Sequence, residues 1–497
     1  MSEPTGVQNC PDAGGIPISE TFTVEARAIE PSGQSTSVSI PAYATNVANV
    51  NIARNEFNKY PIAVASLDVE PGKSVEVRVR YTSEAITAAK VRPVSLGINT
   101  KVEGDTVTFI LDRVVDVMLE VNNDKWKALH ILANEIDRNA PTADAENIWY
   151  FGPGINNGSA YSQVVDGNLK VPSDLTVYLS SGAFVTASFI FEEVSNSGIR
   201  GPGFIYNEPV VHSDRSRPRE LTDMAILIER SESIFVEGVT SLGAKAFSLP
   251  VGQSRNIHIN HYRSFSSAGN GDGIDLFCSC DVLIENCFLR NSDDTIAIYG
   301  HRWDYYGDTS NIRIRNCTLL PDIAHPIQIG THGNPGKPET FSNIHISDID
   351  ILDHYENQMW YQGCISINAG DENLIEDVLV ENIRVEKISK GQLVNIRVMK
   401  NAMWTTAPGR GVRNVTLRNV ELNTGNSETV NPSQILGFDA SRKVENVTFE
   451  NLKIEGKYVH NGMQKPRWYM VSDLVPMFIN EHVKDVKFRL TKEGEKV

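Results

Sequence analysis

The chain has 497 residues, so its length predicts two domains, or one small domain followed by a long repeat array. Apolar residues make up 41% of the chain, and no apolar run reaches the roughly 18 residues that a membrane span needs. The formal net charge of −16 argues against a nucleic-acid partner, because phosphate binding depends on lysine and arginine.

Residues 20–140 are expected to form an antiparallel β-sandwich, preceded by an N-terminal extension over residues 1–19. Apolar and polar residues alternate over 75–80 and 106–111, and turn-forming residues such as those at 103–105 separate the strands. We expect this sandwich to cap the first coil of the following repeats, because an open sheet edge invites association.

A short motif recurs through the second half of the chain: an asparagine or aspartate, an apolar residue, any residue, and another apolar residue. Successive copies start 25 to 39 residues apart. The eight clearest copies start at Asn256, Asp281, Asn311, Asn343, Asp377, Asn414, Asn446 and Asp485.

These repeats predict a right-handed parallel β-helix over residues 141–497, and the fold class is therefore all-β. Each unit is a short alternating strand of β-branched residues, which is too small to bury its apolar face alone but can do so in a stack. Asparagine at matching corners suits left-handed backbone bends and side-chain ladders. We expect Ile284, Ile314, Ile346 and Val380 to point inward in aligned rows.

Three carboxylates and a histidine lie in neighbouring repeats. Asp272 lies in an Asn-Gly-Asp-Gly segment, Asp293 and Asp294 follow 21 and 22 residues later, and His325 lies one repeat beyond. Equivalent residues of stacked strands are ~4.8 Å apart, so the side chains are expected to face one groove. Crowded carboxylates leave one protonated as an acid and another ionised as a base, as glycosidic bond cleavage requires. The simpler interpretation is that these aspartates only cap strand ends.

Aromatic and polar residues near this groove are candidates for sugar binding, because flat rings stack on sugar faces and loops on a rigid scaffold usually carry such contacts. The alternative is that the rings only fill the loops. The candidate substrate-binding residues are His301, Arg302, Trp303, Tyr305, Tyr306, His332, Trp360, Tyr361 and Asn368.

No metal or organic cofactor is expected. The six cysteines are too sparse for a disulfide scaffold, and those within the repeats are interpreted as small buried residues. Cys278 and Cys280 are too close together for the usual zinc-binding pair.

The motifs around the carboxylates resemble two families. Asn270-Gly-Asp-Gly273, Asp293-Asp294 and the segment 324–330 are similar to segments of glycoside hydrolase family 28, the polygalacturonases. The same carboxylates also resemble those of glycoside hydrolase family 49, the dextranases and isopullulanases, whose members carry a β-sandwich before the β-helix. Segments 92–97 and 150–154 are similar to interdomain segments of family 49.

Both resemblances imply an inverting single-displacement hydrolase. Asp293 would be the general acid, and Asp272 and Asp294 would hold and deprotonate the attacking water. His325 would correspond to the polygalacturonase histidine that supports protonation of the acid. His332 is a second candidate for that role.

One departure bears on the substrate. Polygalacturonases carry an Arg-x-Lys strand that binds the uronate carboxylate, whereas the strand expected there is Ile365-Ser-Ile-Asn368, without a cation. The net charge of −16 also disfavours a polyanion. Both observations favour a neutral α-glucan such as dextran.

The leading prediction is a secreted or periplasmic inverting hydrolase of a neutral polysaccharide, with no nucleic-acid or membrane partner. The N-terminal residues lack the pattern of a secretion signal. A polygalacturonase-like hydrolase of pectin is the alternative within the same class. A polysaccharide lyase and a non-catalytic carbohydrate-binding β-helix protein are the alternatives of other classes.

Overall fold

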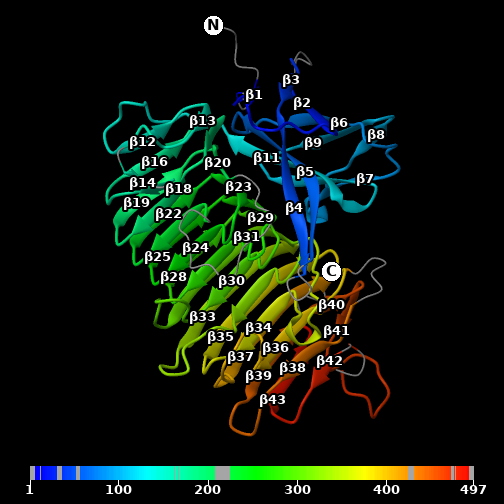
Figure 1. The fold of residues 1–497 in the computed structure, drawn as a ribbon. Coiled ribbons are helices and arrows are strands. Elements are labelled where there is room, and N and C mark those ends of the chain that lie inside the picture. The colour runs from blue at the N-terminus through cyan, green and yellow to red at the C-terminus, as the bar shows by residue number, and fades with distance from the viewer. Residues whose placement is uncertain are drawn as a thin grey trace.

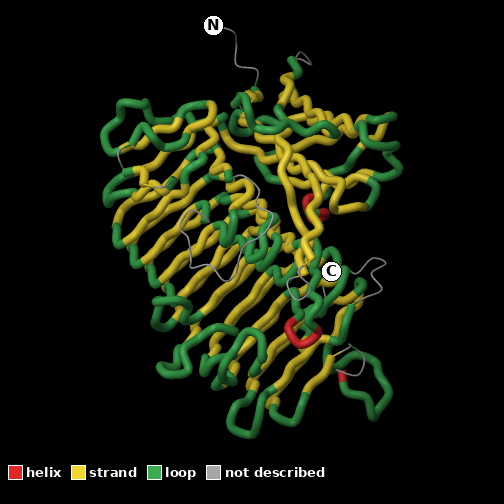
Figure 2. Tube along the Cα trace, in the orientation of Figure 1, coloured by secondary structure: helices red, strands yellow, loops and turns green. Residues whose placement is uncertain are grey.

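The computed structural model contains an N-terminal pair of sheets followed by a long stack of parallel strands (Figure 1). Figure 2 shows that strands and loops make up nearly all of the fold. The structure describes residues 6–491, with the exception of residues 10, 12, 31–35, 52–55, 162, 166, 208–223, 424–429, 472–474 and 476. The short 3-10 helices η2 (Val94–Leu96) and η4 (Met359–Tyr361) lie in loops. No described helix is long and apolar enough to cross a membrane.

Two sheets form the N-terminal sandwich, and the apolar residues of their alternating strands pack into one shared core. Strands β6 (Val75–Tyr81) and β9 (Thr106–Leu111) pair antiparallel, as expected, whereas β5 (Glu56–Val69) and β11 (Asp124–Glu135) pair parallel. The first sheet contains β1 (Val7–Asn9), β4 (Ala42–Asn51), β5 (Glu56–Val69), β7 (Ala89–Arg92), β10 (Val117–Val121) and β11 (Asp124–Glu135). The second contains β2 (Phe22–Ala28), β3 (Val38–Ile40), β6 (Val75–Tyr81), β8 (Lys101–Glu103) and β9 (Thr106–Leu111).

The stack of strands is the expected parallel β-helix, and with it the all-β fold class is confirmed. Two sheets run along it, and among the described strands of these two sheets only the pairs β14–β15 and β40–β41 are antiparallel. The smaller sheet contains β14 (Val164–Val165), β15 (Asn168–Lys170), β18 (Ser188–Glu192), β21 (Ile226–Glu229), β24 (Leu249–Gly252), β27 (Ile274–Phe277), β30 (Ile296–Tyr299), β32 (Ile327–Gly330), β34 (Ile365–Ala369), β36 (Val394–Val398), β38 (Ser433–Leu436) and β42 (Met477–Ile479).

The larger sheet bends around the remainder of each coil. Its first strands are β12 (Ile148–Phe151), β13 (Gly154–Asn156), β16 (Thr176–Leu179), β17 (Ala183–Val185), β19 (Ser195–Arg200), β20 (Phe204–Tyr206), β22 (Glu232–Glu237), β23 (Thr240–Ala244), β25 (Arg255–Asn260) and β26 (Arg263–Ser266). It continues with β28 (Cys280–Glu285), β29 (Phe288–Asn291), β31 (Thr309–Pro321), β33 (Thr340–Ile351), β35 (Leu374–Val385), β37 (Gly411–Leu422), β39 (Val444–Glu450), β40 (Leu452–Ile454), β41 (Lys457–Val459) and β43 (Val483–Arg489).

The interior of the β-helix is built from aligned rows of apolar residues. Ile284 pairs with Ile314, Ile314 with Ile346, and Ile346 with Val380. All four side chains are buried, as expected from the repeat pattern. Each coil therefore covers the apolar face of the next, which no coil could bury by itself.

Ladders of asparagine and aspartate run along the corners of the coils. All eight motif-starting residues have positive φ angles between 54° and 59°, the left-handed conformation that these residue types tolerate best. Asn343 Nδ2 donates to Asn311 Oδ1 at 2.7 Å, and Asn311 Nδ2 donates to Asp281 Oδ1 at 2.8 Å. The motif therefore fixes both the bend of each coil and its register with the next.

The sandwich packs on the β-helix through an apolar interface and buried ion pairs. Phe265 and Phe288 of the β-helix pack with Met118 of the sandwich. Arg263 Nε lies 2.7 Å from Asp116 Oδ2, with both side chains buried. The two bodies are therefore joined by a continuous core, which fixes the sandwich relative to the coils.

A long hairpin of β4 and β5 extends from the sandwich down along the β-helix (Figure 1). Asn49 Nδ2 donates to the Asp322 carbonyl at 3.4 Å, and Ala48 and Val50 pack on Ile323. These contacts bring the described end of β4 to the coil corner that immediately precedes His325.

Candidate active site

The register of the smaller sheet places Asp272, Asp294 and His325 at the same corner of three successive coils. Ile274 of β27 pairs with Ile296 of β30, which pairs with Ile327 of β32. Each of the three polar residues lies two positions before its paired isoleucine. Because the coils are hydrogen-bonded in this register, the three side chains are brought together despite unequal sequence spacings of 22 and 31 residues.

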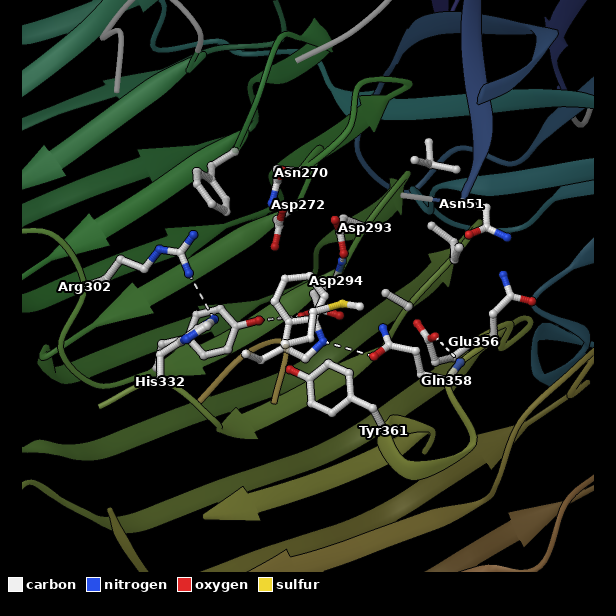
Figure 3. Close-up of a pocket in the computed structure, with 18 residues that line it drawn as sticks. Asn51, Asn270, Asp272, Asp293, Asp294, Arg302, His332, Glu356, Gln358 and Tyr361 are labelled. Atoms are coloured by element: carbon white, nitrogen blue, oxygen red, sulfur yellow. Dashed lines mark hydrogen bonds between the residues drawn. The ribbon is translucent and has the colours of Figure 1, made fainter. Parts of the chain in front are cut away.

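The three expected carboxylates form one cluster, which Figure 3 shows at the centre of a pocket. One oxygen from each of Asp272, Asp293 and Asp294 lies within 4.8 Å of the others. Asp272 and Asp294 are buried, and Asp293 is half-buried. Three carboxylates this close repel one another when ionised, so the cluster retains protons at a pH where an isolated aspartate would lose them.

The surroundings of Asp272 favour its protonated form. Burial, and then the charges of Asp275, Asp293 and Asp294, raise the pKa of Asp272 well above its usual range. Asp275 lies on β27 with neither carboxyl oxygen hydrogen-bonded among the described residues, and burial raises its pKa as well. Two buried carboxyl groups, of which Asp272 lines the pocket, therefore favour the neutral form.

Asp294 has the opposite electrostatic character. Its Oδ1 accepts hydrogen bonds from the backbone amide of His325 at 2.9 Å and from His325 Nδ1 at 2.7 Å, and its Oδ2 accepts one from the Tyr299 hydroxyl at 2.6 Å. Although burial opposes ionisation, the charge of His325 and these hydrogen bonds hold the pKa of Asp294 below its usual value. Asp294 is therefore the ionised carboxylate of the cluster.

His325 is the cationic partner of Asp294. Burial alone would lower its pKa, but the charge of Asp294 and its hydrogen bond raise the pKa of His325 to about 9. The other ring nitrogen, Nε2, donates to the backbone carbonyl of Tyr361. With both ring nitrogens donating, the imidazolium is held in place at neutral pH. The carboxylate that His325 contacts at 2.7 Å is Asp294, whereas the resemblance implied support of Asp293.

The pocket around the cluster has a volume of about 110 Å³. The far end of the β4–β5 hairpin forms part of its wall, so both the sandwich and the β-helix contribute to it (Figure 3). Besides the three carboxylates, its lining residues are Val50, Asn51, Phe247, Asn270, Tyr299, Arg302, Ile323, Ala324, His332, Glu356, Asn357, Gln358, Tyr361, Met403 and Trp404.

Three of the expected substrate-binding residues line the pocket: Arg302, His332 and Tyr361. Arg302 Nη1 donates to His332 Nε2 at 2.9 Å. Burial, and then the charge of Arg302, lower the pKa of His332 to about 3, so its imidazole is neutral and accepts this hydrogen bond. Arg302 is the only lysine or arginine among the described residues that line the pocket.

The other expected substrate-binding residues lie outside the pocket lining. Tyr305 is fully buried and its hydroxyl donates to Glu229 Oε2 at 2.6 Å, so it packs inside its loop. Asn368 is also fully buried on β34 and donates to Ser366. His301 Nδ1 lies 2.6 Å from the Tyr305 carbonyl. The remaining three expose much of their ring surface on the loops beside the pocket: Trp303, Tyr306 and Trp360.

Sequence reasoning missed several lining residues. Tyr299 follows Asp294 at the end of β30, where alternation with the inward Ile296 and Ile298 places it on the pocket side, so the pattern could have revealed it. Glu356 and Trp404 lie in loops and Asn51 lies in the sandwich hairpin, and no local pattern marks them as neighbours of the cluster.

The carboxylate cluster is also the one group of described residues that could hold a metal ion. Its donor set is oxygen alone, as hard cations prefer. Burial and the neighbouring carboxylates favour the neutral form of Asp272, and this carboxyl group would have to lose its proton to bind a metal ion.

The comparisons with known proteins agree with this geometry. The family model "Glycosyl hydrolases family 28" matches residues 162–467. A polygalacturonase of Juniperus ashei is 23% identical over 331 residues, which span 63% of this chain and 58% of the relative. A polygalacturonase of Chamaecyparis obtusa is 25% identical over 240 residues, which span 48% of this chain and 42% of the relative. The chain thus spans about half the length of these curated relatives.

The solved structure of Dex49A from Penicillium minioluteum resembles the whole fold, with a TM-score of 0.61. The similarity covers 97% of this chain and 96% of that one at 14% sequence identity, which shows the fold alone. The family-49 assignment that was expected from the sequence is therefore not confirmed. Because the family model covers more than half of the chain and includes all three carboxylates and His325, the chain belongs to glycosyl hydrolases family 28.

Proposed function

We propose that this protein hydrolyses glycosidic bonds in a polysaccharide of the pectin type, with inversion at the anomeric carbon. The observation that carries the proposal is the pocket cluster, in which Asp294, whose pKa is lowered, lies beside Asp272, whose pKa is raised, and the half-buried Asp293. Acid-base hydrolysis requires ionised and protonated carboxyl groups on one surface. The two relatives named above are polygalacturonases, which favours a pectic substrate over the dextran expected from the sequence.

In the proposed mechanism Asp294 is the general base. Its carboxylate takes a proton from a water molecule as the water oxygen attacks the anomeric carbon. The bond from that carbon to the leaving oxygen breaks, and the leaving oxygen takes a proton from Asp293, the most accessible of the three carboxyl groups. Atoms and charge balance, because Asp294 gains the proton that Asp293 loses.

Asp272 is proposed to position the water instead of sharing the base role expected for it. Its raised pKa favours the protonated form, which has no free carboxylate to take a proton, but its carboxyl group can still hydrogen-bond the water that Asp294 deprotonates. His325 keeps Asp294 ionised through the contact at 2.7 Å.

The closeness of the carboxylates does not by itself predict retention. Separations of ~5–5.5 Å are typical of retaining glycosidases and ~6.5–9.5 Å of inverting ones. Inversion is supported here by two carboxyl groups, Asp272 and Asp294, that can hold one water between them.

A neutral α-glucan is the second candidate substrate, and one observation favours it. Strand β34 lies next to β32, with Ser366 opposite Gln328 and Asn368 opposite Gly330. This is the strand on which the polygalacturonase resemblance placed two cations, and its described residues carry none. A uronate bound there would therefore lack a charged partner on β34 itself.

Substrate trials separate these functions. Purified protein is incubated with polygalacturonate, dextran and pullulan, and reducing ends are measured, with Asp293→Asn as the inactive control. We expect reducing ends from polygalacturonate only. Release from dextran alone would favour the second candidate, and an unsaturated, ultraviolet-absorbing uronate product would indicate a lyase. Binding without any bond cleavage would indicate a carbohydrate-binding protein.

The stereochemistry is tested by proton NMR of the first product formed from a substrate of known linkage. The inverted anomer is expected before mutarotation. Initial formation of the retained anomer would refute the assignment of Asp294 as base to a water molecule. A secreted or periplasmic location, where a polymeric substrate is accessible, is proposed as well and is tested by fractionating cells that express the full gene.

A further inference from the structure

We propose that Arg302, fixed by His332, binds the carboxylate of the sugar that occupies the pocket and so determines selectivity for an acidic substrate. The inference rests on the proposed function and deepens it. It assigns the carboxylate-binding role to the loop between β30 and β31. The family resemblance would instead place that role on β34.

The loop that carries Arg302 is anchored on both sides of this residue. The backbone amide of His301 donates to Glu339 Oε2 at 2.8 Å, and the Tyr305 amide donates to the Arg302 carbonyl at 3.0 Å. The buried Tyr305 side chain attaches the loop to Glu229. The backbone of Arg302 is therefore held between fixed points, which a residue that orients a ligand requires.

The guanidinium of Arg302 lies beside His332, on the side of the carboxylate cluster away from Asn51 (Figure 3). Its hydrogen bond to the neutral imidazole restrains the side chain but does not neutralise its charge. Among the described residues, no carboxylate lies at ion-pair distance from Arg302, whereas buried arginines such as Arg263 and Arg290 have aspartate partners.

A restrained arginine without an ion-pair partner at a pocket wall is suited to bind a carboxylate. One of its five N–H donors is used by His332, and the planar group can offer two parallel donors to two carboxylate oxygens. A neutral sugar could accept only ordinary hydrogen bonds there. The repulsion from the ionised Asp294 would also turn an acidic sugar so that its carboxylate faces Arg302.

A simpler role for Arg302 is to reduce the repulsion within the carboxylate cluster, since its charge lowers the pKa of Asp272. That role predicts an equal effect on every substrate, through the pH dependence of the reaction. Carboxylate binding predicts an effect that depends on the charge of the substrate. The two roles are therefore separable by comparing an acidic polymer with its neutral ester.

The experiment compares Arg302→Gln and Arg302→Lys with wild type on polygalacturonate and on the same polymer after methyl esterification. For Arg302→Gln we expect kcat/KM on polygalacturonate to fall by ~10- to 100-fold, the range for loss of a charge-assisted hydrogen bond, mainly through KM. The preference for acid over ester should fall towards one. Arg302→Lys should retain part of the preference, because it keeps the charge but not the planar donors.

The matched control is Arg313→Gln, since Arg313 is an exposed arginine on β31, outside the pocket lining. It should leave both rates unchanged. Equal losses on the acid and the ester in Arg302→Gln, or no loss on the acid, would overturn the inference while leaving the proposed function intact.

A binding measurement separates failure of the inference from failure of the proposed function. Titration of Asp293→Asn with an oligogalacturonate, by calorimetry, is repeated in the double variant with Arg302→Gln. If wild type cleaves no uronate polymer but binding depends on Arg302, the proposed function fails and the carboxylate site stands. If the oligomer binds equally in both variants, or in neither, the inference fails.

Discussion

Replacing His325 by glutamine should move the acidic limb of the pH–rate profile to higher pH. In the proposed mechanism the base Asp294 must be ionised, and the His325 imidazolium favours that state through a contact of 2.7 Å. Without the cation the pKa of Asp294 rises, so a higher pH is needed to ionise it. Glutamine retains hydrogen-bonding capacity and approximate size but has no charge.

The magnitude follows from the pKa of His325 itself. The rise from 6.5 to about 9 corresponds to ~3 kcal/mol in favour of the charged ring, at about 1.36 kcal/mol for each pH unit. Because an interaction between two ionising groups acts equally on both, and Asp294 is the largest favourable contribution, the acidic limb should move up by on the order of 2 pH units.

The assay is kcat/KM against pH on polygalacturonate for wild type, His325→Gln and His354→Gln. His354 is a matched control: it is a buried histidine with its ring centroid 6.2 Å from that of His325, and burial lowers its pKa to about 3, so it is neutral. Its replacement should leave the limb in place. A uniform loss of rate in His325→Gln, with an unmoved acidic limb, would refute the electrostatic role of His325.

Three further predictions concern the same ion pair and the core. Tyr299→Phe removes the hydroxyl that is hydrogen-bonded to Asp294 at 2.6 Å. It should move the acidic limb of the pH–rate profile to higher pH, but less far than His325→Gln does, because the donor that is lost is neutral. No movement would exclude Tyr299 from stabilising the base. Because the pKa of His325 is raised by folding, its contribution to stability is fully present below pH 6.5 and is lost as pH rises through about 9. The melting temperature should therefore decline over that interval in wild type more steeply than in His325→Gln, and parallel curves would contradict the assignment. Ile314→Ala should lower the free energy of unfolding in denaturant titrations by ~2–5 kcal/mol, because Ile314 is buried in the aligned apolar row inside the β-helix. The control Arg313→Ala, on the exposed face, should change the free energy of unfolding by less than ~0.5 kcal/mol. Equal losses in the two variants would mean that the apolar row does not stabilise the fold.

The sequence by itself determined the β-helix and the grouping of Asp272, Asp294 and His325. An inward isoleucine or valine and a corner asparagine recur in each coil, and each is satisfied only by its counterpart in the next coil. The physical reason is that hydrogen bonding between adjacent coils transmits the register from one strand to the next. Residues at the same offset from a paired strand must therefore stack, whatever the length of the loops between them.

Only the tertiary structure decided which loop residues reach the pocket. Asn51 enters it because the sandwich hairpin docks on the β-helix, with Asn49 bonded to Asp322 from 273 positions away. Tyr305 lies in the aromatic segment expected to bind sugar, yet its hydroxyl is drawn inward to Glu229. Loop conformation depends on such distant partners, whose positions follow from the packing of whole domains, and no local repeat encodes them. For the same reason the sequence could indicate that Arg302 is near the site but not that His332 holds it at the pocket wall.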